Sequence, residues 1–468
     1  MRVTNKIIQN NALTNINVNK VLQDKLSTMI STEKKIARPS EDPIVALRSL
    51  RLRTSVNQTE QYVEKNVEDA KSWLTVTEDA ISTLSDIITD IRKQYVKGSS
   101  DTLEPSDRKI ILDNLEALAA EVYNTGNADF AGRSVFTGFR TESTLTFQKQ
   151  ENIEYEITET LDSLTSDEIS FVHTDTAEND VYATKIKRLR LSYSKTDNAT
   201  PTVKLNGSNA TVTTMSKTAD PYSFVHDNDT AVVYVPETGE ILIGSAAATG
   251  DITSAEVTYK KSEWDKGDLK PEHYFNCKDN TNNISYTTHN GEIEYNIGVN
   301  QFLRINTNAG ECFTHDIIRD IEDATYALRD QIDIDDKIAE IEARIESLPG
   351  TDTVGIANAQ KELDAAKKAK TFIDDKLTTL FGKNITNADV YLNKTSVALT
   401  NCGTRSKRLD LIENRLDTQL FSLKELKSEN EDADLAETAI RLSSAQYAYD
   451  ASLMSTSKII KESLLNYI

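Results

Sequence analysis

An unbroken alternation of four- and three-residue spacings constrains the fold of this chain more than any other feature of its sequence. Apolar and small residues recur at these spacings at Val63, Val67, Ala70, Leu74, Thr77, Ile81, Leu84, Ile88, Ile91 and Tyr95. Such a heptad seam predicts a helix that packs lengthwise against other long helices. At about 1.5 Å of rise per residue, this helix is roughly 50 Å long, so it needs partners of matching length.

Two further seams near the C-terminus supply the expected partners. The first lies in a long helix that we predict to begin at Asp389, and its residues are Leu409, Ile412, Leu416, Gln419, Leu423 and Leu426. The second comprises Leu435, Ala439, Leu442, Gln446, Tyr449, Leu453, Thr456 and Ile460. The acidic segment 429–434 separates the two seams. Seams at both ends of the chain indicate that the termini come together.

The N-terminal segment predicts a marginal helix followed by a bend. Residues 11–36 carry a thin apolar stripe of Val18, Leu22, Leu26 and Met29. A helix with so little apolar surface is marginal in water and needs a partner. Residues 38–43, of sequence Arg-Pro-Ser-Glu-Asp-Pro, then break the helix. Ser40 or Asp42 is placed to cap the next helix, which we expect to continue through the first seam.

The middle of the chain has a different composition, which is rich in Thr, Ser, Asn and Asp. Short runs typical of strands occur at 153–157, 232–235, 241–243, 257–259 and 293–297, and turn signals separate them. We therefore predict an inserted all-β domain of about 170 residues. Residues 331–381 carry helical patterns on either side of Pro349-Gly350, which indicates a helical hairpin.

These patterns define a fold class and a division into domains. We predict an α+β protein: an elongated antiparallel helical bundle or coiled coil built from both chain ends, with an inserted all-β outer domain and a helical hairpin. Residues 1–40 and 435–468 form a terminal helical domain. Residues 41–140 and 314–434 form a long-helix rod domain that includes the hairpin 331–381, and residues 141–313 form the β domain.

Charge and hydropathy exclude several classes of partner. The 468 residues include 53 Lys and Arg against 74 Asp and Glu, for a net charge of −21. A chain this acidic repels nucleic acid and anionic lipid, so we expect neither as a main partner. No stretch approaches the roughly 18 apolar residues that span a bilayer. The N-terminus lacks the apolar core of a cleaved signal peptide, although export by another route stays open.

Residue types that carry chemistry are sparse and scattered. Cys277, Cys312 and Cys402 have neither disulfide-framework nor zinc spacing, so we expect three inert thiols. The histidines form no His-Glu-x-x-His motif, and they are His173, His226, His273, His289 and His315. Phosphate-binding and nucleophile-elbow motifs are absent from the sequence. We therefore expect no catalysis, no cofactor and no metal.

Several local motifs resemble the flagellin family of bacterial flagella. Residues 38–43 look like the Arg-Pro-Ser-Asp-Asp-Pro signature of its junction-forming members, where filament flagellin has an apolar, Ala- and Gly-rich version. Residues 132–138 look like the Gly-Arg-x-x-Phe-x-Gly turn of the same members. The start of the chain and the tail also match, at residues 1–6, 414–417, 431–434 and 453–456. The resemblance covers residues 1–140 and 384–468 well and residues 314–330 more weakly, whereas residues 141–313 and 331–381 match only in being where the family varies.

The resemblance implies a structural axial protein of the flagellum that joins hook and filament. It implies terminal helices that are disordered in the free subunit, and export of the unfolded chain through the flagellar type III channel without a cleaved signal peptide. The implied location is extracellular. The implied partners are further copies of the chain in a ring, a first junction protein on the hook, flagellin, and an export chaperone.

Terminal helices with weak seams should fold when neighbouring subunits bury their apolar stripes. We expect this packing to involve Val18, Leu22, Leu435, Leu442, Tyr449 and Leu453. Three alternatives stay open: a flagellin filament subunit, an intracellular coiled-coil scaffold, and an extracellular adhesin whose β domain 141–313 contacts a glycan on a helical rod. The signature at residues 38–43 and the terminal residues 464–468 argue against the filament subunit.

Overall fold

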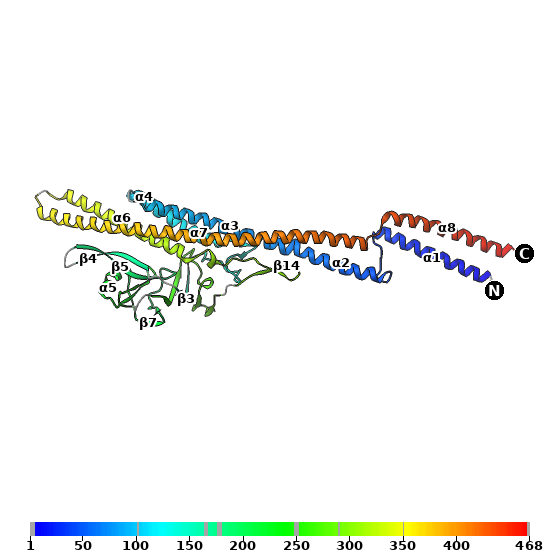
Figure 1. The fold of residues 1–468 in the computed structure, drawn as a ribbon, viewed down its shortest axis with the longest axis horizontal. Helices are drawn as coiled ribbons and strands as arrows, with labels where there is room; N and C mark the ends of the chain where they lie inside the picture. Colours follow the sequence, from blue (N-terminus) through cyan, green and yellow to red (C-terminus); the bar gives the residue numbers. More distant parts are fainter. Residues whose placement is uncertain are drawn as a thin grey trace. The chain divides into compact units, whose positions relative to one another are not determined.

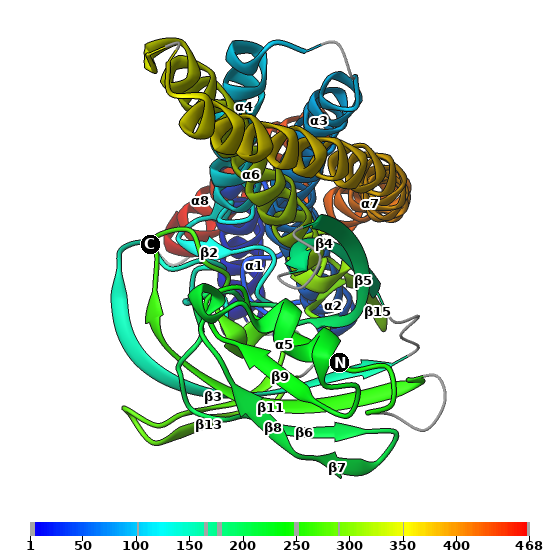
Figure 2. The same cartoon turned by 90° about the vertical axis from the view of Figure 1, so that its left-hand side faces the viewer.

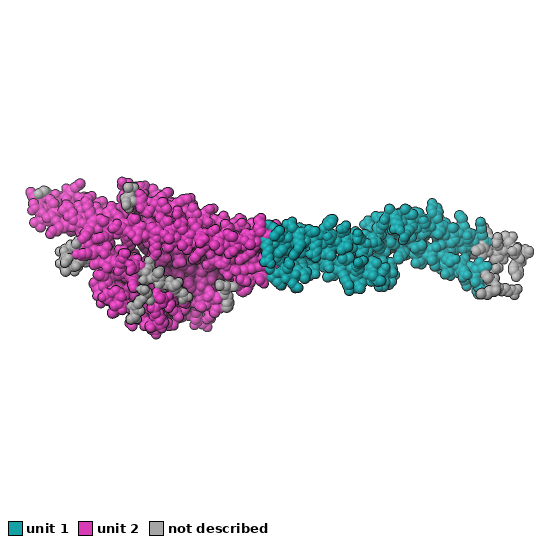
Figure 3. Space-filling model, viewed as in Figure 1, with its two compact units in different colours: residues 1–69, 296–302, 408–468 teal, residues 70–295, 303–407 magenta. Residues whose placement is uncertain are grey.

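The computed structural model describes residues 5–100, 103–162, 167–175, 180–247, 252–288, 291–349 and 351–465. Long helices occur together with β-sheets, which confirms the predicted mixture of α and β structure. The chain forms two compact units, which Figure 3 colours separately. Unit 1 comprises residues 1–69, 296–302 and 408–468, and unit 2 comprises residues 70–295 and 303–407. The three-domain division drawn from the sequence stays a prediction.

Unit 1 contains three helices and the last part of a fourth (Figure 1). These three are α1 (Asn5–Thr32), α2 (Pro43–Gln61) and α8 (Leu435–Leu465). The sequence prediction of a helix over 11–36 was wrong at both ends. The helix already includes Asn5, and it stops at Thr32 because Glu33 adopts a left-handed backbone, with φ of 58°.

The chain between α2 and α3 (Glu68–Gly98) stays helical but contains an irregular turn. Tyr62–Val67 forms a π-helical turn, where the sequence predicted an uninterrupted α-helical seam. A π turn widens the helix and changes the direction of the side chains that follow it. Val63 is accordingly half-buried, whereas Val67 is fully buried.

The seam of α3 forms a large part of the helical core of unit 2. Every predicted seam residue from Ala70 to Tyr95 is buried. A partner helix is α7 (Thr353–Glu431), which contacts α3 at several points, among them Cys402 Sγ, 3.5 Å from the Leu74 carbonyl. The Tyr95 ring lies against Phe381, with 5.8 Å between ring centroids, and Arg92 Nε is 2.7 Å from Asp389 Oδ1. These contacts come from the C-terminal half of the chain, but Phe381 and Asp389 precede the seam predicted to begin at Leu409.

Helix α7 runs unbroken through 79 residues, so the prediction that a new helix begins at Asp389, after the hairpin 331–381, was wrong. The intervening segment 382–388 contains no proline, and its polar side chains have partners on α6 (His315–Ser347). Asn384 Nδ2 donates to the Asp320 carbonyl at 3.0 Å, and Asn387 Nδ2 donates to the Asp320 carboxylate at 2.9 Å. These tertiary contacts hold the segment helical despite its weak helix propensity.

Helix α6 of unit 2 packs against two other helices, α4 and the first part of α7. α4 (Pro105–Thr125) packs along α6, and Arg108 lies 3.2 Å from Asp335. α6 also packs against the first part of α7 around a small apolar cluster of Ile341, Leu363 and Ala366. Figure 1 shows the two helices running back along each other. The described part of residues 331–381 therefore forms two packed helices, and Gly350 between them lies outside the described residues.

The middle of the chain forms two larger sheets within the described residues. One has the strand order β13-β12-β3-β11-β6-β7, with β3 (Glu151–Asp162), β6 (Thr202–Leu205), β7 (Ser208–Ala210), β11 (Ser254–Trp264), β12 (Asn276–Asp279) and β13 (Ile284–Tyr286). The other has the order β4-β5-β10-β9-β8, with β4 (Asp167–Asp175), β5 (Asp180–Arg190), β8 (Val212–Thr214), β9 (Val232–Val235) and β10 (Glu240–Ile243). All pairs are antiparallel except β8 with β9. Figure 2 shows these strands on one side of α6 and α7.

Two short hairpins complete the β structure of the described residues. β1 (Asp129–Phe130) pairs with β2 (Arg133–Ser134), and β14 (Glu294–Gly298) pairs with β15 (Gln301–Arg304). The turn between β1 and β2 consists of Ala131 and Gly132, both with positive φ. All five runs predicted as strands fall in strands, and the last is displaced by one residue.

The sequence predicted an all-β insert, but the inserted region also contains helical structure. A short helix, α5 (Pro221–Asp227), lies between β8 and β9. Asp220 caps it by accepting a hydrogen bond from the Ser223 amide, and Pro221 occupies its first position. Pro221 and Val225 are buried, so this helix covers part of the insert core.

Aromatic side chains form the centre of the insert. Trp264 is fully buried and contacts the rings of Phe147, Tyr155 and Tyr193. Its indole Nε1 donates to the carbonyl of Ile153 at 2.9 Å. Trp264 is therefore a core residue, an assignment that its turn-like sequence surroundings did not allow.

Candidate assembly surface

The two terminal helices of unit 1 form an antiparallel pair. Lys34 and Asp432 face each other at one end, and Asn19 Nδ2 lies 3.5 Å from the Ala448 carbonyl further along. Leu26 of α1 is buried in this contact. On α8 the side facing α1 is marked by buried or half-buried residues at heptad spacing: Thr438, Leu442, Ala445, Tyr449, Ser452 and Thr456.

This inner face of α8 corrects part of the seam predicted from the sequence. Leu442, Tyr449 and Thr456 belong to it, as predicted. Leu435, Ala439, Gln446 and Leu453 are instead exposed, while Thr438 and Ala445 are buried. A helix buries one continuous stripe, and here small residues line it because they allow the helices to approach closely. The side chain of Ile460 lies outside those described.

The outer faces of this pair remain strongly apolar. On α1 the exposed apolar residues are Ile7, Leu13, Val18, Val21 and Leu22. On α8 they are Leu435, Ile440, Tyr447, Leu453 and Met454, with Tyr447 77% exposed. An exposed apolar area of this extent marks an interaction surface.

Exposed apolar side chains also occur on α2 and at the end of α7. Ile44, Leu47 and Leu50 are exposed on α2, and Leu411, Phe421 and Leu426 are exposed on α7. Of the 26 large hydrophobic side chains exposed within the described residues, 18 lie in unit 1, which holds less than a third of the chain. Apolar exposure is thus concentrated in the unit formed by the chain ends. We call these outer faces of α1, α2, α8 and the end of α7 the assembly surface.

The buried stripe at the end of α7 follows an eleven-residue repeat rather than the predicted heptads. Leu409, Ile412, Leu416 and Leu420 are buried, whereas the predicted seam residues Gln419 and Leu426 are exposed. Leu409, Leu420 and Glu431 repeat at an interval of eleven. Eleven residues in three turns match a straight helix more closely than seven in two. Residues spaced as heptads therefore move progressively away from the buried face along this helix.

The six residues predicted to pack between subunits divide into two groups. Val18, Leu22, Leu435 and Leu453 are exposed on the assembly surface. Leu442 and Tyr449 are half-buried against α1. Their role between subunits stays a prediction. The structure adds Val21, Ile440, Tyr447 and Met454 to the exposed apolar residues. The sequence could have identified them only if it had shown which residues of α1 and α8 form the buried stripe between the two helices.

A bend connects α1 to α2 and is capped in a defined way. Asp42, rather than Ser40, caps α2, and its carboxylate accepts hydrogen bonds from the amides of Ile44 and Val45 at 3.0 Å each. The chain segment after α1 also pairs with the segment between α7 and α8. Lys35 N donates to the Glu431 carbonyl, and Ala433 N donates to the Glu33 carbonyl, at 2.7 and 2.9 Å.

Glu431 is the centre of a polar cluster at this bend. Its side chain is 4% exposed. Arg53 donates from Nε and Nη2 to its two oxygens at 2.7 Å, and Ser49 Oγ donates to Oε1 at 2.5 Å. The Arg53 hydrogen bonds are the main cause that lowers the pKa of Glu431. The heptad pattern of the sequence gave no sign that Glu431 was the partner of Arg53.

Two histidines of unit 2 are buried. Burial lowers the pKa of His315 to about 3 and that of His273 to about 4. His315 lies among the rings of Tyr193, Tyr274 and Phe275. Among the described residues, no three His, Cys, Asp or Glu side chains are grouped so that they could hold a metal ion. His289 lies outside the described residues.

The three cysteines are all buried free thiols. Burial raises the pKa of Cys277 to about 12 and that of Cys402 to about 11, which keeps both thiols protonated and unreactive at neutral pH. In the described part of the chain, no helix is both long and apolar enough to cross a membrane.

Comparison with known families identifies the N-terminal part of the chain. Residues 3–141 match the bacterial flagellin N-terminal helical region. Over these residues, the chain is similar to the flagellin family. This stretch contains α1, the bend at residues 38–43, α2, α3 and α4. The family resemblance seen in the sequence motifs is therefore confirmed.

Two curated flagellin-family relatives are both named flagellar hook-associated protein 3. The protein from Salmonella typhimurium is 26% identical over 144 residues, which are 31% of this chain and 45% of the relative. The protein from Escherichia coli is 28% identical over 120 residues, which are 25% of this chain and 38% of the relative. The matched stretches thus span less than half of either relative.

Two solved structures were also found to be similar. One, from Vibrio parahaemolyticus, is described as a flagellar hook-associated protein. It is 12% identical, with a TM-score of 0.38, over 84% of this chain and 100% of that chain. The flagellar junction protein from Legionella pneumophila is 9% identical, with a TM-score of 0.28, over 77% of this chain and 99% of that chain.

Proposed function

We propose that this protein is a structural subunit of the bacterial flagellum that forms the junction between hook and filament and templates flagellin assembly. The observation that carries the proposal is the assembly surface of unit 1. Its helices are well formed, yet their outer faces expose large apolar side chains such as Val18, Leu22 and Leu453. Exposure of such faces to water is unfavourable, and the free energy falls when neighbouring subunits cover them.

The names of the two relatives reported above favour the junction. The two curated relatives reported above both bear the name hook-associated protein 3. Residues 38–43, where Asp42 caps α2, also resemble the signature of junction-forming members that was noted in the sequence. A structural role without catalysis, cofactor or metal is part of the proposal.

The domain division and the partners form part of the same proposal. Residues 1–40 and 435–468 would form the inner coiled coil of a ring of subunits. Residues 41–140 and 314–434 would form the adjoining rod, and the insert 141–313 would point outward. The partners would be the first hook-associated junction protein, flagellin and an export chaperone. The subunit would be exported by the flagellar type III route, without a cleaved signal peptide, to the extracellular flagellum.

Immunogold labelling of intact flagella tests the proposal, with an antibody raised against residues 141–313. We expect one narrow band of label where the hook meets the filament. A strain that lacks the protein is the control for antibody specificity, and it should shed flagellin monomers into the medium. Label along the whole filament would assign the protein to flagellin instead. Label over the cell body alone would favour an adhesin, and absence of label outside the cell would favour a scaffold.

A further inference from the structure

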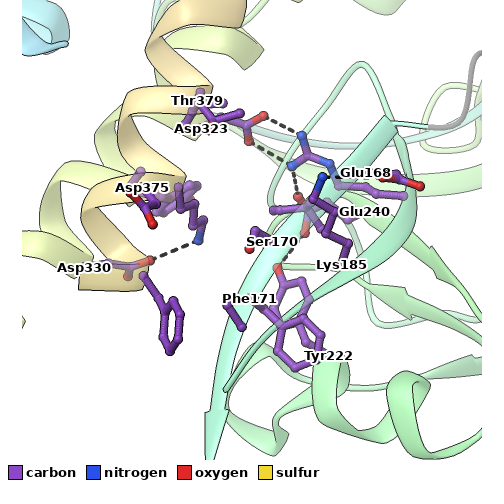
Figure 4. A pocket seen from close by; sticks show the side chains of 18 of the residues that line it. Glu168, Ser170, Phe171, Lys185, Tyr222, Glu240, Asp323, Asp330, Asp375 and Thr379 are labelled. Carbon is purple, nitrogen blue, oxygen red and sulfur yellow. Dashed lines mark hydrogen bonds and ion pairs between the residues drawn. The ribbon is translucent and has the colours of Figure 1, made fainter. Parts of the chain in front are cut away.

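A cavity of about 370 Å³ opens in unit 2 between the five-stranded sheet and the helices α6 and α7. Figure 4 shows side chains from both sides converging on it. Glu168, Lys185 and Tyr222 come from the sheet side, whereas Asp330 and Asp375 come from the helices. Its volume falls within the range of small-molecule sites in proteins. Nothing in the assembly role proposed above makes use of it.

The floor of the cavity is a rigid polar network. Arg188 Nη1 donates to Glu240 at 2.5 Å, and its Nη2 donates to Asp323 at 2.9 Å. The Tyr222 hydroxyl donates to the other oxygen of Glu240 at 2.9 Å, and so does the Thr238 hydroxyl, also at 2.9 Å. Arg188 and Glu240 are almost fully buried. Such a network holds the side chains above it in one arrangement before any ligand arrives.

The charges around the cavity cancel. Five cationic side chains line it: Lys185, Arg188, Lys217, Lys376 and Lys383. Five carboxylates line it as well: Glu168, Glu240, Asp323, Asp330 and Asp375. The formal charges of these lining side chains therefore sum to zero, unlike those of a phosphate or polyamine site. The charge balance favours a neutral ligand.

The ion pairs at the cavity mouth are long and leave hydrogen-bonding capacity free. Lys185 Nζ lies 4.0 Å from Glu168, and Lys376 Nζ lies 3.6 Å from Asp330. These distances exceed those of a close hydrogen-bonded pair. Hydroxyl groups of a ligand could therefore insert between the partners, accepting from a lysine and donating to a carboxylate.

Aromatic rings line both sides of the cavity. On the sheet side, Phe171 and Tyr222 stack with 5.9 Å between ring centroids. On the helix side, the half-buried Phe372 and Tyr326 face the same space, and the Lys217 ammonium lies 4.4 Å from the Tyr326 ring centroid. Flat apolar surfaces on opposite sides of a polar centre match a ligand with apolar faces and a rim of hydroxyls.

We propose that this cavity binds a neutral carbohydrate of one or two sugar residues. The ring faces of a sugar carry C–H groups that pack on aromatic side chains, and its hydroxyls both donate and accept hydrogen bonds. Phe372 and Tyr222 would hold the apolar faces, while Lys185, Asp330 and Asp375 would bind the hydroxyls. The proposal is independent of the junction role and adds a binding activity to the outer insert.

Ligand-observed saturation-transfer NMR and calorimetric titration on the full chain test this inference. The probes are four neutral disaccharides, namely maltose, cellobiose, lactose and N,N′-diacetylchitobiose, together with AMP and spermidine as charged probes. We expect at least one disaccharide to bind. Phe372→Ala should weaken that binding by about tenfold, because the variant removes one aromatic wall.

Phe224→Ala is the matched control, because Phe224 is an exposed ring on α5 outside the cavity. It should leave the affinity unchanged. Asp375→Asn serves as a second variant, since Asp375 is exposed and its replacement leaves the fold intact while weakening the hydroxyl contact. Three results would overturn the proposal: no disaccharide that binds, equal affinities in Phe372→Ala and Phe224→Ala, or tighter binding of AMP or spermidine than of every sugar.

Discussion

Arg53 of α2 holds both carboxylate oxygens of Glu431 at the end of α7, with two nitrogen–oxygen distances of 2.7 Å. The two residues are far apart in sequence, and the carboxylate is almost fully buried. A bidentate arginine–carboxylate pair is both stronger and more directional than a single ion pair. It therefore fixes the end of α7 next to the bend between α1 and α2 within unit 1.

Replacing Glu431 should loosen this region. In Glu431→Ala, Arg53 and Ser49 lose their acceptor, and we expect unit 1 to lose about 1–3 kcal/mol of stability. Hydrogen exchange measures this as faster exchange of amides in 43–61 and 420–431. The matched control is Glu60→Gln, which breaks the solvent-accessible pair with Lys424 and should leave the protection of these amides nearly unchanged. Equal amide protection in the two variants would show that the Arg53–Glu431 pair does not stabilise this region.

Two glycines of the insert should respond very differently to the same substitution. Gly239 has φ of +61°, and an added Cβ would lie 2.0 Å from the Tyr193 carbonyl oxygen. Gly207 also has a positive φ, of +80°, but nothing lies within 4 Å of its added Cβ. Gly239→Ala should cost about 3 kcal/mol or more, and Gly207→Ala only about 1 kcal/mol. Urea denaturation measures both, and similar midpoints for the two variants would contradict this account.

His315 should make unit 2 less stable in acid. Its folded pKa is about 3, while an unfolded histidine has a pKa near 6.5. The unfolded chain therefore binds more protons below about pH 6.5, and stability falls as the pH drops from there toward 3. The maximum slope is about 1.4 kcal/mol per pH unit for this histidine.

His315→Phe keeps a ring among Tyr193, Tyr274 and Phe275 but removes the titration. Denaturation of this variant from pH 7 to 4 should show a shallower decline than the natural protein shows. Tyr274→Phe is the control, because it removes the hydroxyl that donates to the Phe313 carbonyl without removing a titrating histidine. It should lower stability by a similar amount at each pH, and an unchanged slope in His315→Phe would refute the assignment.

Charged substitutions on the assembly surface should abolish assembly without unfolding the subunit. Val18→Asp and Leu453→Asp replace exposed apolar side chains, so the circular dichroism of the free chain should not change. Assembly would bury the new charge without a partner at a cost of several kcal/mol, so both variants should fail to form junctions and cells should lose motility. Val354→Asp, an exposed position in unit 2, is the control and should assemble. Normal junctions in Val18→Asp would exclude this face from the contact.

Local patterns in the sequence were sufficient for much of the secondary structure. The α3 seam from Ala70 to Tyr95, the five short strands and the helix start after Asp42 follow from periodicity, β-branched content and capping. These features depend on neighbours within a few residues, and such neighbours are visible in a linear pattern. The family resemblance followed for the same reason, because its motifs are short and contiguous.

Other features depended on contacts between distant segments. The continuity of α7 through 382–388 depends on Asp320 of another helix, and the phase of the α8 stripe depends on which face α1 covers. The pairing of Arg53 with Glu431 and the convergence of Tyr222 with Phe372 on one cavity join residues that are more than a hundred positions apart. A linear pattern records the spacing of residues but not the partner of each face. The tertiary packing alone therefore decided which apolar residues of the terminal helices became core and which were left exposed for other subunits.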